Sequence, residues 1–354
     1  MSDYADLEQR YRRVLRLLPA YYRSTWEQDM VAAFLESSLT GDPDEDEWVL
    51  EFSKPPWREI ASVVGLAVRL YLGGSAAPRR YFAWGQAVRR AVLAFTLLRA
   101  VWSLDVLLLT AWSRRVFSWV PVPPARLAAG TPAGLLPPTV WWLVADAWVV
   151  SFVALAFGRY YRTAQVIAAL GIVPDLVWLL QGGFTRAFHG PSLGPWAFWV
   201  LLNLAPVLAM TAFHRDTPPD ARWPWLLALV TAYLLVAVPL TALQTSGHSA
   251  WVPDTAGLFC VLTALACLAH VPRAWSRQAA GSGVWSLTLT LLAAQAGAYR
   301  ALSLTDYLHD LHQVQVSLAE LLILVLAVAL IVPDAIRAQA AVHAPPRPRQ
   351  GYPR

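Results

Sequence analysis

Three aspartates inside long apolar segments are the side chains in this sequence best suited to chemistry. Asp105, Asp146 and Asp175 fall in the first three such segments, at similar depths if each segment is a helix rising about 1.5 Å per residue. Ionisable groups are costly in an apolar medium, so each is a candidate for function. Carboxylates that share a buried site compete for ionisation, which suits proton exchange, and Arg99 offers them a counter-ion. We expect either a proton or cation pathway or a set of buried ion pairs.

A second set of charged and histidine side chains lies near the end of the chain. Arg300 and Glu320 stand at the outer ends of the last two apolar segments, and we expect a structural ion pair between them. The stretch LTDYLHDLH holds His309 and His312, whose spacing suits one helical face and so zinc binding or titration. Two nitrogen ligands alone do not make a zinc site. The sequence therefore predicts no metal site, and His309 and His312 are only weak candidates for metal ligands.

The chemical motifs that this sequence lacks narrow its function further. Its single lysine, Lys54, stands in EFSKPP, so there is no GxxxxGK[ST] loop for nucleotide phosphates. There is also no HExxH zinc-protease motif. We therefore expect a protein without enzymatic activity and without a cofactor. Transport would have to use an ion gradient or a separate ATPase subunit on the cytoplasmic side.

Composition and hydropathy predict that these residues are carried by membrane-spanning helices. Hydrophobic residues make up 57% of the 354 residues and charged residues 14%, against about 25% charged in a typical soluble domain. The apolar residues form eight segments, each near the roughly 20 residues that a bilayer core requires. These segments cover residues 91–112, 139–157, 163–182, 196–213, 224–243, 254–271, 284–302 and 316–333. We expect an all-α fold, with about eight transmembrane helices in residues 76–335.

The distribution of arginine predicts which side of the membrane each loop faces. Cytoplasmic loops are enriched in basic residues, and a cytoplasmic N-terminus places most arginines inside, from Arg79 before the first segment to the tail. The exception is the trio Arg114, Arg115 and Arg126, which this topology places outside. We expect a multi-pass protein of the cell membrane with both termini cytoplasmic. Residues 336–354 should form a disordered Pro- and Arg-rich tail, and no direct nucleic-acid binding is expected.

The first 75 residues are typical of a cytoplasmic module of three amphipathic helices with an acidic linker. Pro19 should end the first helix, and Pro55 and Pro56 should open the third. Helical spacing assigns a buried face to each helix. The expected faces are Leu7, Tyr11, Val14, Leu15 and Leu18; then Tyr22, Trp26, Met30, Ala33 and Phe34; then Trp57, Ile60, Val64, Ala67 and Tyr71. These faces predict a small bundle; the alternative is a set of helices lying flat on lipid.

This N-terminal module resembles a known pattern, carried by YRRVLRLLPAYYRSTWEQDMVAAFLES and, after a polar gap, by WREIASVVGLAVRLYLGG. It is similar to the N-terminal helical modules of actinobacterial membrane proteins, which are of the HAAS type (PadR-associated signalling domains) or the permease-prefix type. The resemblance rests on arginine, aromatic and proline positions and brings no catalytic residues. It implies a cytoplasmic regulatory or assembly module, linked with a PadR-like transcription factor.

These observations predict a non-enzymatic integral membrane protein whose cytoplasmic head recruits or responds to a cytosolic partner. The expected partners are the lipid bilayer and, through residues 1–75, a PadR-like regulatory protein or an ATPase subunit. One alternative is a permease or exporter membrane subunit that uses the intramembrane aspartates. Another is an intramembrane enzyme acting on lipid-linked substrates, which rests on the external His/Asp cluster alone.

Overall fold

The computed structural model describes residues 4–38, 54–73, 78–113, 138–158, 160–187, 193–213, 221–245, 254–276, 282–308 and 310–343. Every regular element in these ranges is a helix, which confirms the all-α class for them. The chain divides into two compact units, Met1–Gly85 and Gln86–Arg354, and the division falls within helix α5 (Arg79–Ser113). The boundary expected after residue 75 stays a prediction, because no observation tests it directly.

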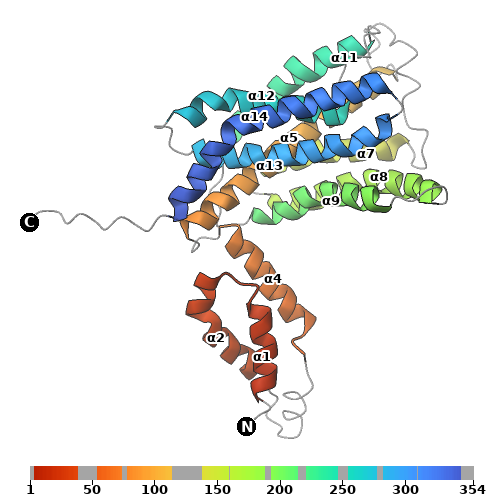
Figure 1. Ribbon diagram of the computed structural model, residues 1–354. Coiled ribbons are helices and arrows are strands. Elements are labelled where there is room, and N and C mark those ends of the chain that lie inside the picture. The colour runs from red at the N-terminus through yellow and green to blue at the C-terminus, as the bar shows by residue number, and fades with distance from the viewer. Residues whose placement is uncertain are drawn as a thin grey trace, which may run out of the picture. The chain divides into compact units, whose positions relative to one another are not determined.

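The first unit contains helices α1 (Tyr4–Leu15), α2 (Ala20–Ser38) and α4 (Trp57–Tyr71) (Figure 1). Proline sets their limits as expected, since α2 begins directly after Pro19 and α4 directly after Pro56. The acidic linker between α2 and α4 lies outside the described residues. One apolar core joins the three helices; its buried members are Leu7, Tyr11, Leu15, Leu18, Val31, Phe34, Val63, Ala67 and Leu70.

The expected buried face is correct for α1, correct for Tyr22, Met30 and Phe34 of α2, and in α4 correct only for Ala67 among its buried residues. In α2 the ring of Phe34 stacks on Tyr11, with 4.0 Å between centroids, and this contact turns Trp26 outward to 49% exposure. In α4 the buried residues are Val63, Ala67 and Leu70, whereas Trp57 is 77% exposed. Because α4 is apolar over two adjacent faces, periodicity alone cannot say which of them enters the core.

The second unit is built from helices that follow the eight expected apolar segments closely (Figure 1). After α5 come α7 (Pro138–Ala156), α8 (Tyr161–Ala187), α9 (Leu193–Ala209) with the 3-10 turn η1 (Met210–Ala212), α10 (Arg222–Ala232), the π turn η2 (Tyr233–Ala237), α11 (Val238–Thr245), α12 (Thr255–Trp275), α13 (Ser282–Ser303) with the 3-10 turn η4 (Leu304–Tyr307), and α14 (Leu311–His343). The eight predicted segments are thus all helical where the structure describes them.

The last helix corrects one expectation about the C-terminal tail. Residues 336–343 were assigned to a disordered tail, but α14 continues through them to His343. The sequence AIRAQAAVH favours this continuation, because alanine, glutamine and arginine are good helix formers. Residues 344–354 lie outside the described part of the chain, and for them the tail stays a prediction.

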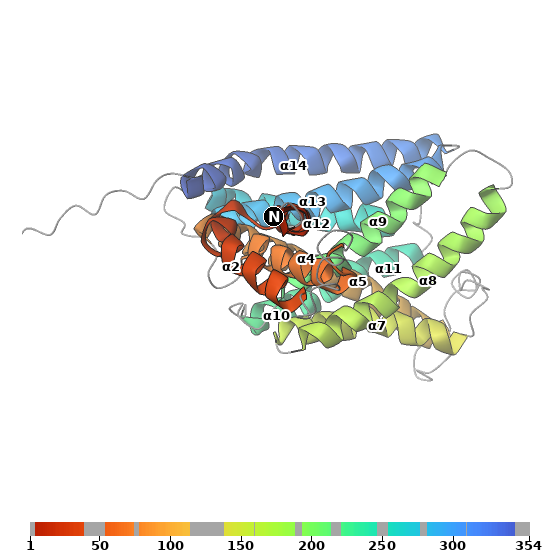
Figure 2. The same cartoon turned by 90° about the horizontal axis from the view of Figure 1, so that it is seen from below.

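Two groups of helices organise the second unit. Helices α7 and α8 form an antiparallel pair joined by a short connection, and α12, α13 and α14 lie side by side in both views (Figure 1 and Figure 2). Helix α5 joins both groups: the ring of Phe95 packs edge-on against Trp148 of α7 and Phe259 of α12. The central core that results is continuous across these helices.

Both units have an apolar core, but they differ in the polar side chains that they bury. In the described part of the first unit, the buried side chains are apolar or aromatic. In the second unit many are polar or charged: Arg89, Thr96, Ser103, Asp105, Ser151, Asn203, Thr263, His270, Ser286, Thr288, Arg300, Ser317 and Glu320. Its surface, by contrast, displays large apolar residues, which on α14 alone include Leu318, Leu322, Ile323, Val325, Leu326 and Ile336. The second unit therefore hides polar groups and displays apolar ones.

Two described helical stretches are long and apolar enough to cross a membrane: Ala256–Trp275 in α12 and Leu311–Arg337 in α14. Shorter apolar stretches occur at Ala147–Ala156, Tyr161–Val173, Val200–Ala212 and Arg222–Ala237. This agrees with the expected membrane character at a coarse level. The number of about eight spans and the location of the termini stay predictions.

Candidate functional site

The bundle of α12, α13 and α14 carries the densest set of buried polar side chains in the second unit. Its inward positions recur at alternating spacings of three and four, the pattern of closely packed helices. These positions are Cys260, Thr263, Cys267, His270 and Ala274 in α12; Ser286, Leu289, Ala293, Ala296 and Arg300 in α13; and Ser317, Glu320, Leu324, Ala327 and Ile331 in α14. Small residues in the middle allow close approach, and polar residues gather at both ends.

At one end, Arg300 lies between two carboxylates. Its side chain is 1% exposed; Nη1 donates to Asp254 Oδ1 at 2.8 Å, and Nη2 lies 2.6 Å from Glu320 Oε2. Asp254 also caps α12, because its Oδ1 accepts from the backbone N–H of Gly257 at 2.8 Å. The structure therefore brings the expected pair Arg300 and Glu320 together and adds a third member.

This Arg300 cluster joins the beginning of α12, the end of α13 and the beginning of α14. A buried guanidinium is tolerated only when opposite charges surround it, and here two carboxylates do so. The Nε atom of Arg300 has no hydrogen-bond partner among the described residues. The sequence analysis missed Asp254, although an aspartate directly before an apolar helix is an N-cap signal that indicates its place.

At the other end, a serine hydroxyl links a histidine to an aspartate. Ser286 Oγ donates to Asp334 Oδ2 at 2.7 Å, and His270 Nε2 lies 3.1 Å from the same Oγ. Because the serine proton is committed to the carboxylate, Oγ accepts from Nε2–H of His270. Arg337 Nη2 lies 3.8 Å from Asp334 Oδ1 and donates to the carbonyl of Ala274. This His270 cluster joins the same three helices as the Arg300 cluster.

The two clusters are about 21 Å apart along the bundle, since Ser286 and Arg300 are separated by fourteen residues at about 1.5 Å each. Between them lie the free, buried thiols of Cys260 and Cys267. The Sγ of Cys260 donates to the carbonyl of Ala296 at 3.5 Å. Apart from these thiols and the buried hydroxyl of Thr263, the inward positions of this middle layer are apolar, so the two polar clusters are separate.

The aspartates predicted to form a pathway lie on α5, α7 and α8. Asp105 is buried on α5. The side chains of Asp146 and Asp175 lie outside the described part, but their backbones are placed. Trp148 Nε1 donates to the carbonyl of Gly171 at 3.2 Å, so Trp148 and Gly171 lie at the same level along the pair of α7 and α8. Because the two helices are antiparallel, the residues before Trp148 and the residues after Gly171 extend in the same direction along the pair. Residues 146 and 175 therefore lie about 3 Å and about 6 Å, respectively, from the level of this contact.

Arg99 contacts the same layer from α5. Its guanidinium carbon lies 4.8 Å from the ring centroid of Trp148, a cation–π geometry. Asp105 follows six residues later, which places the two side chains on different faces of α5. The contact between α7 and α8 thus places residues 146 and 175 in neighbouring layers, while the ring contact of Arg99 was not predicted from the sequence.

The histidine stretch before α14 has a structural role in the described residues. Asp310 caps α14, since its Oδ1 accepts from the backbone N–H of His312 at 3.0 Å and of Gln313 at 3.3 Å. His309 lies outside the described part. Within the described ranges, no group of three or more His, Cys, Asp or Glu side chains is arranged to hold a metal ion.

The head contains a polar contact and an apolar groove. Tyr11 Oη donates to Glu59 Oε1 at 2.8 Å, and burial, with the nearby carboxylate, raises the pKa of Tyr11 above its usual value. Arg12 pairs with Glu8 and with Glu27, which raises its own pKa.

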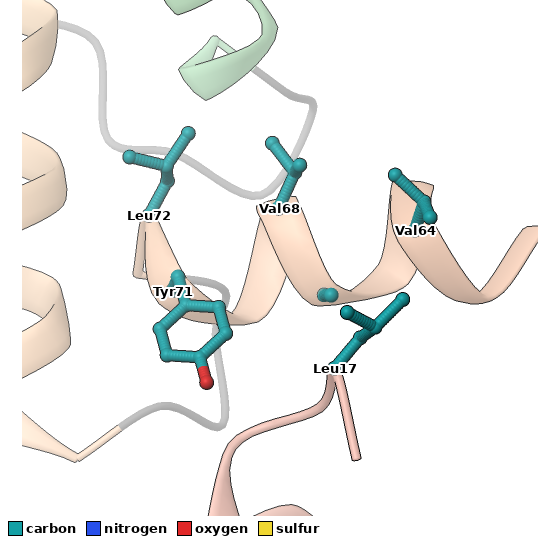
Figure 3. A pocket seen from close by; sticks show the side chains of 6 residues that line it. Leu17, Val64, Val68, Tyr71 and Leu72 are labelled. Carbon is teal, nitrogen blue, oxygen red and sulfur yellow. The ribbon is translucent and has the colours of Figure 1, made fainter. Parts of the chain in front are cut away.

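A groove of about 360 Å³ opens beside α4 and is lined by Leu17, Val64, Ala67, Val68, Tyr71 and Leu72 (Figure 3).

Comparison of the chain with protein-family models, with curated proteins and with solved structures found no match to any of them.

Proposed function

We propose that this protein is a non-enzymatic, multi-pass membrane protein with a cytoplasmic head that docks a regulatory or assembly partner. One observation carries the membrane part of the proposal: the second unit buries polar and charged side chains as well as apolar ones and displays many large apolar side chains, whereas the described buried side chains of the first unit are apolar or aromatic. Exposed apolar surface of this extent is unfavourable in water and favourable against lipid. Both termini are assigned to the cytoplasmic side by the arginine distribution.

The docking role of the head is supported by its own architecture. It has a separate apolar core and forms a compact unit of its own. Its helix α2 presents Trp26 to solvent, next to Tyr22 at 6.5 Å between ring centroids. Exposed aromatic residues of this kind are enriched at the centres of protein interfaces. The resemblance to HAAS-type modules points to a PadR-like regulator, and permease-prefix segments point to an ATPase subunit.

The docking proposal is tested by cross-linking in intact membranes followed by purification and mass spectrometry. The full chain is compared with the variant Trp26→Ala and with the matched control Ser24→Ala, whose hydroxyl bonds only to the carbonyl of Tyr21 in its own helix. We expect one cytosolic protein to be cross-linked to the full chain and to the control, and to be lost with Trp26→Ala. Identical cross-links in all three proteins would contradict a role for this face.

A second function, a permease or exporter membrane subunit, is favoured by the burial of Asp105 and by the neighbouring layers of residues 146 and 175. Its test is substrate-independent: proton uptake by proteoliposomes under an imposed potential. The permease proposal expects uptake by the native chain and its loss on Asp105→Asn. No uptake above that of empty liposomes would rule out a proton pathway and leave the docking function in place.

A further inference from the structure

Helix α4 has a second apolar face that the head core does not use. The core takes Val63, Ala67 and Leu70. About 100° around the helix lies another row, with Val64 in the middle and Trp57 and Tyr71 two turns away on either side. Trp57 is 77% exposed, and Val64 and Tyr71 are each 42% exposed. This outer face of α4, defined by Trp57, Ile60, Val64, Val68 and Tyr71, is the face that lines the groove beside Leu17 (Figure 3).

The charges that border this face are positive. Residues 54–73 contain Lys54, Arg58 and Arg69, all exposed, and a single acidic residue, Glu59. Glu59 is turned toward the core, where its carboxylate accepts the hydrogen bond from Tyr11. The outer face is therefore apolar along its length, with aromatic side chains at both ends and cationic side chains along its border.

We propose that the outer face of α4 lies on the surface of a bilayer that contains anionic phospholipid. This inference rests on the proposed membrane location of the second unit. Apolar residues on one side, basic residues at the border and Trp or Tyr at the ends are the features of a helix that lies in the interface plane. Tryptophan and tyrosine place an apolar ring and a polar tip at the boundary of lipid and water.

Continuity of the chain favours lipid over a protein helix as the occupant. Helix α4 ends at Tyr71 and α5 begins at Arg79, so the face is tethered close to α5, in which residues 91–112 form the first expected span. The first turns of α5 add Phe82 and Trp84, both exposed within the same compact unit as α4. A row of exposed aromatics next to the entry of a span is the arrangement of an interfacial belt. With α4 on lipid, the opposite surface of the head is left for a cytosolic partner.

The test uses the full-length chain in lipid nanodiscs with one nitroxide label. Cys260 and Cys267 are replaced by alanine, and the label is placed through Val64→Cys on the outer face or through Ser62→Cys on the polar side of the same helix. Discs contain phosphatidylcholine alone or mixed with phosphatidylglycerol. Collision of the label with oxygen, which concentrates in lipid, is compared with collision with a water-soluble nickel chelate.

We expect the label at position 64 to collide with oxygen in preference to the nickel chelate, and this preference to grow with phosphatidylglycerol. The label at position 62 should prefer the chelate in every disc. The double change Arg58→Glu and Arg69→Glu should remove the response to phosphatidylglycerol. A label at position 64 that collides freely with the chelate would overturn the proposal, and so would one shielded from both reagents, which is the result expected for a face covered by protein.

A third label separates this proposal from the proposed membrane location. Leu326 is exposed on α14, so a label at Leu326→Cys must lie in lipid if the second unit spans the bilayer. Preference for oxygen at position 326 together with preference for the chelate at position 64 would overturn the lipid face of α4 alone. Preference for the chelate at both positions would overturn the membrane location as well.

Discussion

At the scale of single residues, Arg300 is the side chain on which the structure depends most. It is completely buried and holds a carboxylate from α12 and another from α14. Pairing of this kind adds little stability compared with well-packed apolar residues, but removal of one partner is costly because it leaves charges buried without compensation. Arg300 thus selects the arrangement of three helices.

We expect Arg300→Gln to destabilise the bundle by about 3–5 kcal/mol, because Asp254 and Glu320 lose their counter-ion. The native thiols of Cys260 and Cys267 are fully buried reporters, so heating in detergent with a thiol-reactive coumarin maleimide measures the unfolding midpoint. The control is Arg273→Gln, an exposed arginine on α12 that belongs to neither cluster. Equal unfolding midpoints for the two variants would show that the Arg300 cluster does not stabilise the bundle.

Tyr11 gives the head a dependence on alkaline pH whose sign follows from its raised pKa. The folded head keeps the phenol protonated at pH values where the unfolded chain, with a pKa near 10, releases the proton. Stability is therefore complete below about pH 10 and is lost as the pH rises further. We expect Tyr11→Phe to lower stability at pH 8 by about 1 kcal/mol, through loss of the bond to Glu59, and to flatten this alkaline decline.

The alkaline decline is measured by the rate at which iodoacetamide reaches a cysteine introduced by Val31→Cys in the head core, with Cys260 and Cys267 changed to alanine. The control Tyr22→Phe leaves Tyr11 in place and should keep the alkaline increase in labelling rate. If Tyr11→Phe shows the same increase as the native tyrosine, another group is responsible.

At the scale of helices, the polar contacts at the two ends of α12, α13 and α14 fix their register. At one end, the single hydroxyl of Ser286 on α13 connects His270 of α12 to Asp334 of α14. We expect Ser286→Ala to lower stability by about 1–3 kcal/mol, because both neighbours lose a buried partner. The same thiol-labelling assay measures the change.

A double-mutant cycle with Asp334→Asn tests whether the serine acts through the aspartate. The cost of the double variant should be smaller than the sum of the two single costs, since one link is removed in each case. Thr290→Val is the matched control on α13, because its hydroxyl bonds only to the carbonyl of Ser286 in the same helix. Additive costs would show that the hydroxyl and the carboxylate act independently.

Helix positions could be predicted from this sequence because apolar length and proline specify them directly. Helices α7 and α12 begin and end within a few residues of their expected segments. The buried face of α4 could not be predicted, since its apolar surface spans two faces and the contact of Tyr11 with Glu59 decides between them. That contact joins residues far apart in the sequence and leaves no periodic signal.

Only part of the candidate site could be predicted from the sequence. Arg300 and Glu320 stand out as charges in apolar segments, so periodicity and depth were sufficient to pair them. His270, Ser286 and Asp334 form a cluster only because three helices meet, and a lone serine or histidine near a helix end carries no such information. Asp254 was visible as an N-cap, but its second role toward Arg300 requires the packing of α12 on α13.

At the scale of the whole molecule, the polar side chains buried in the second unit and the apolar ones on its surface support the proposal that the two units face different solvents. A head with an apolar core suits water. A second unit with large apolar side chains on its surface and hydrogen-bonded polar clusters inside suits lipid. The docking function and the lipid face of α4 both depend on this division, because each requires a head that stays at the cytoplasmic surface.

The most direct measurement is therefore the labelling of single cysteines by a membrane-impermeant maleimide in intact spheroplasts, in a chain with Cys260 and Cys267 changed to alanine. Ser118→Cys reports on the loop with Arg114, Arg115 and Arg126, and Ser24→Cys and Gln350→Cys report on the two ends of the chain. The account predicts labelling at position 118 in intact cells and labelling at positions 24 and 350 only after permeabilisation. Labelling of positions 24 and 118 from the same side would contradict it.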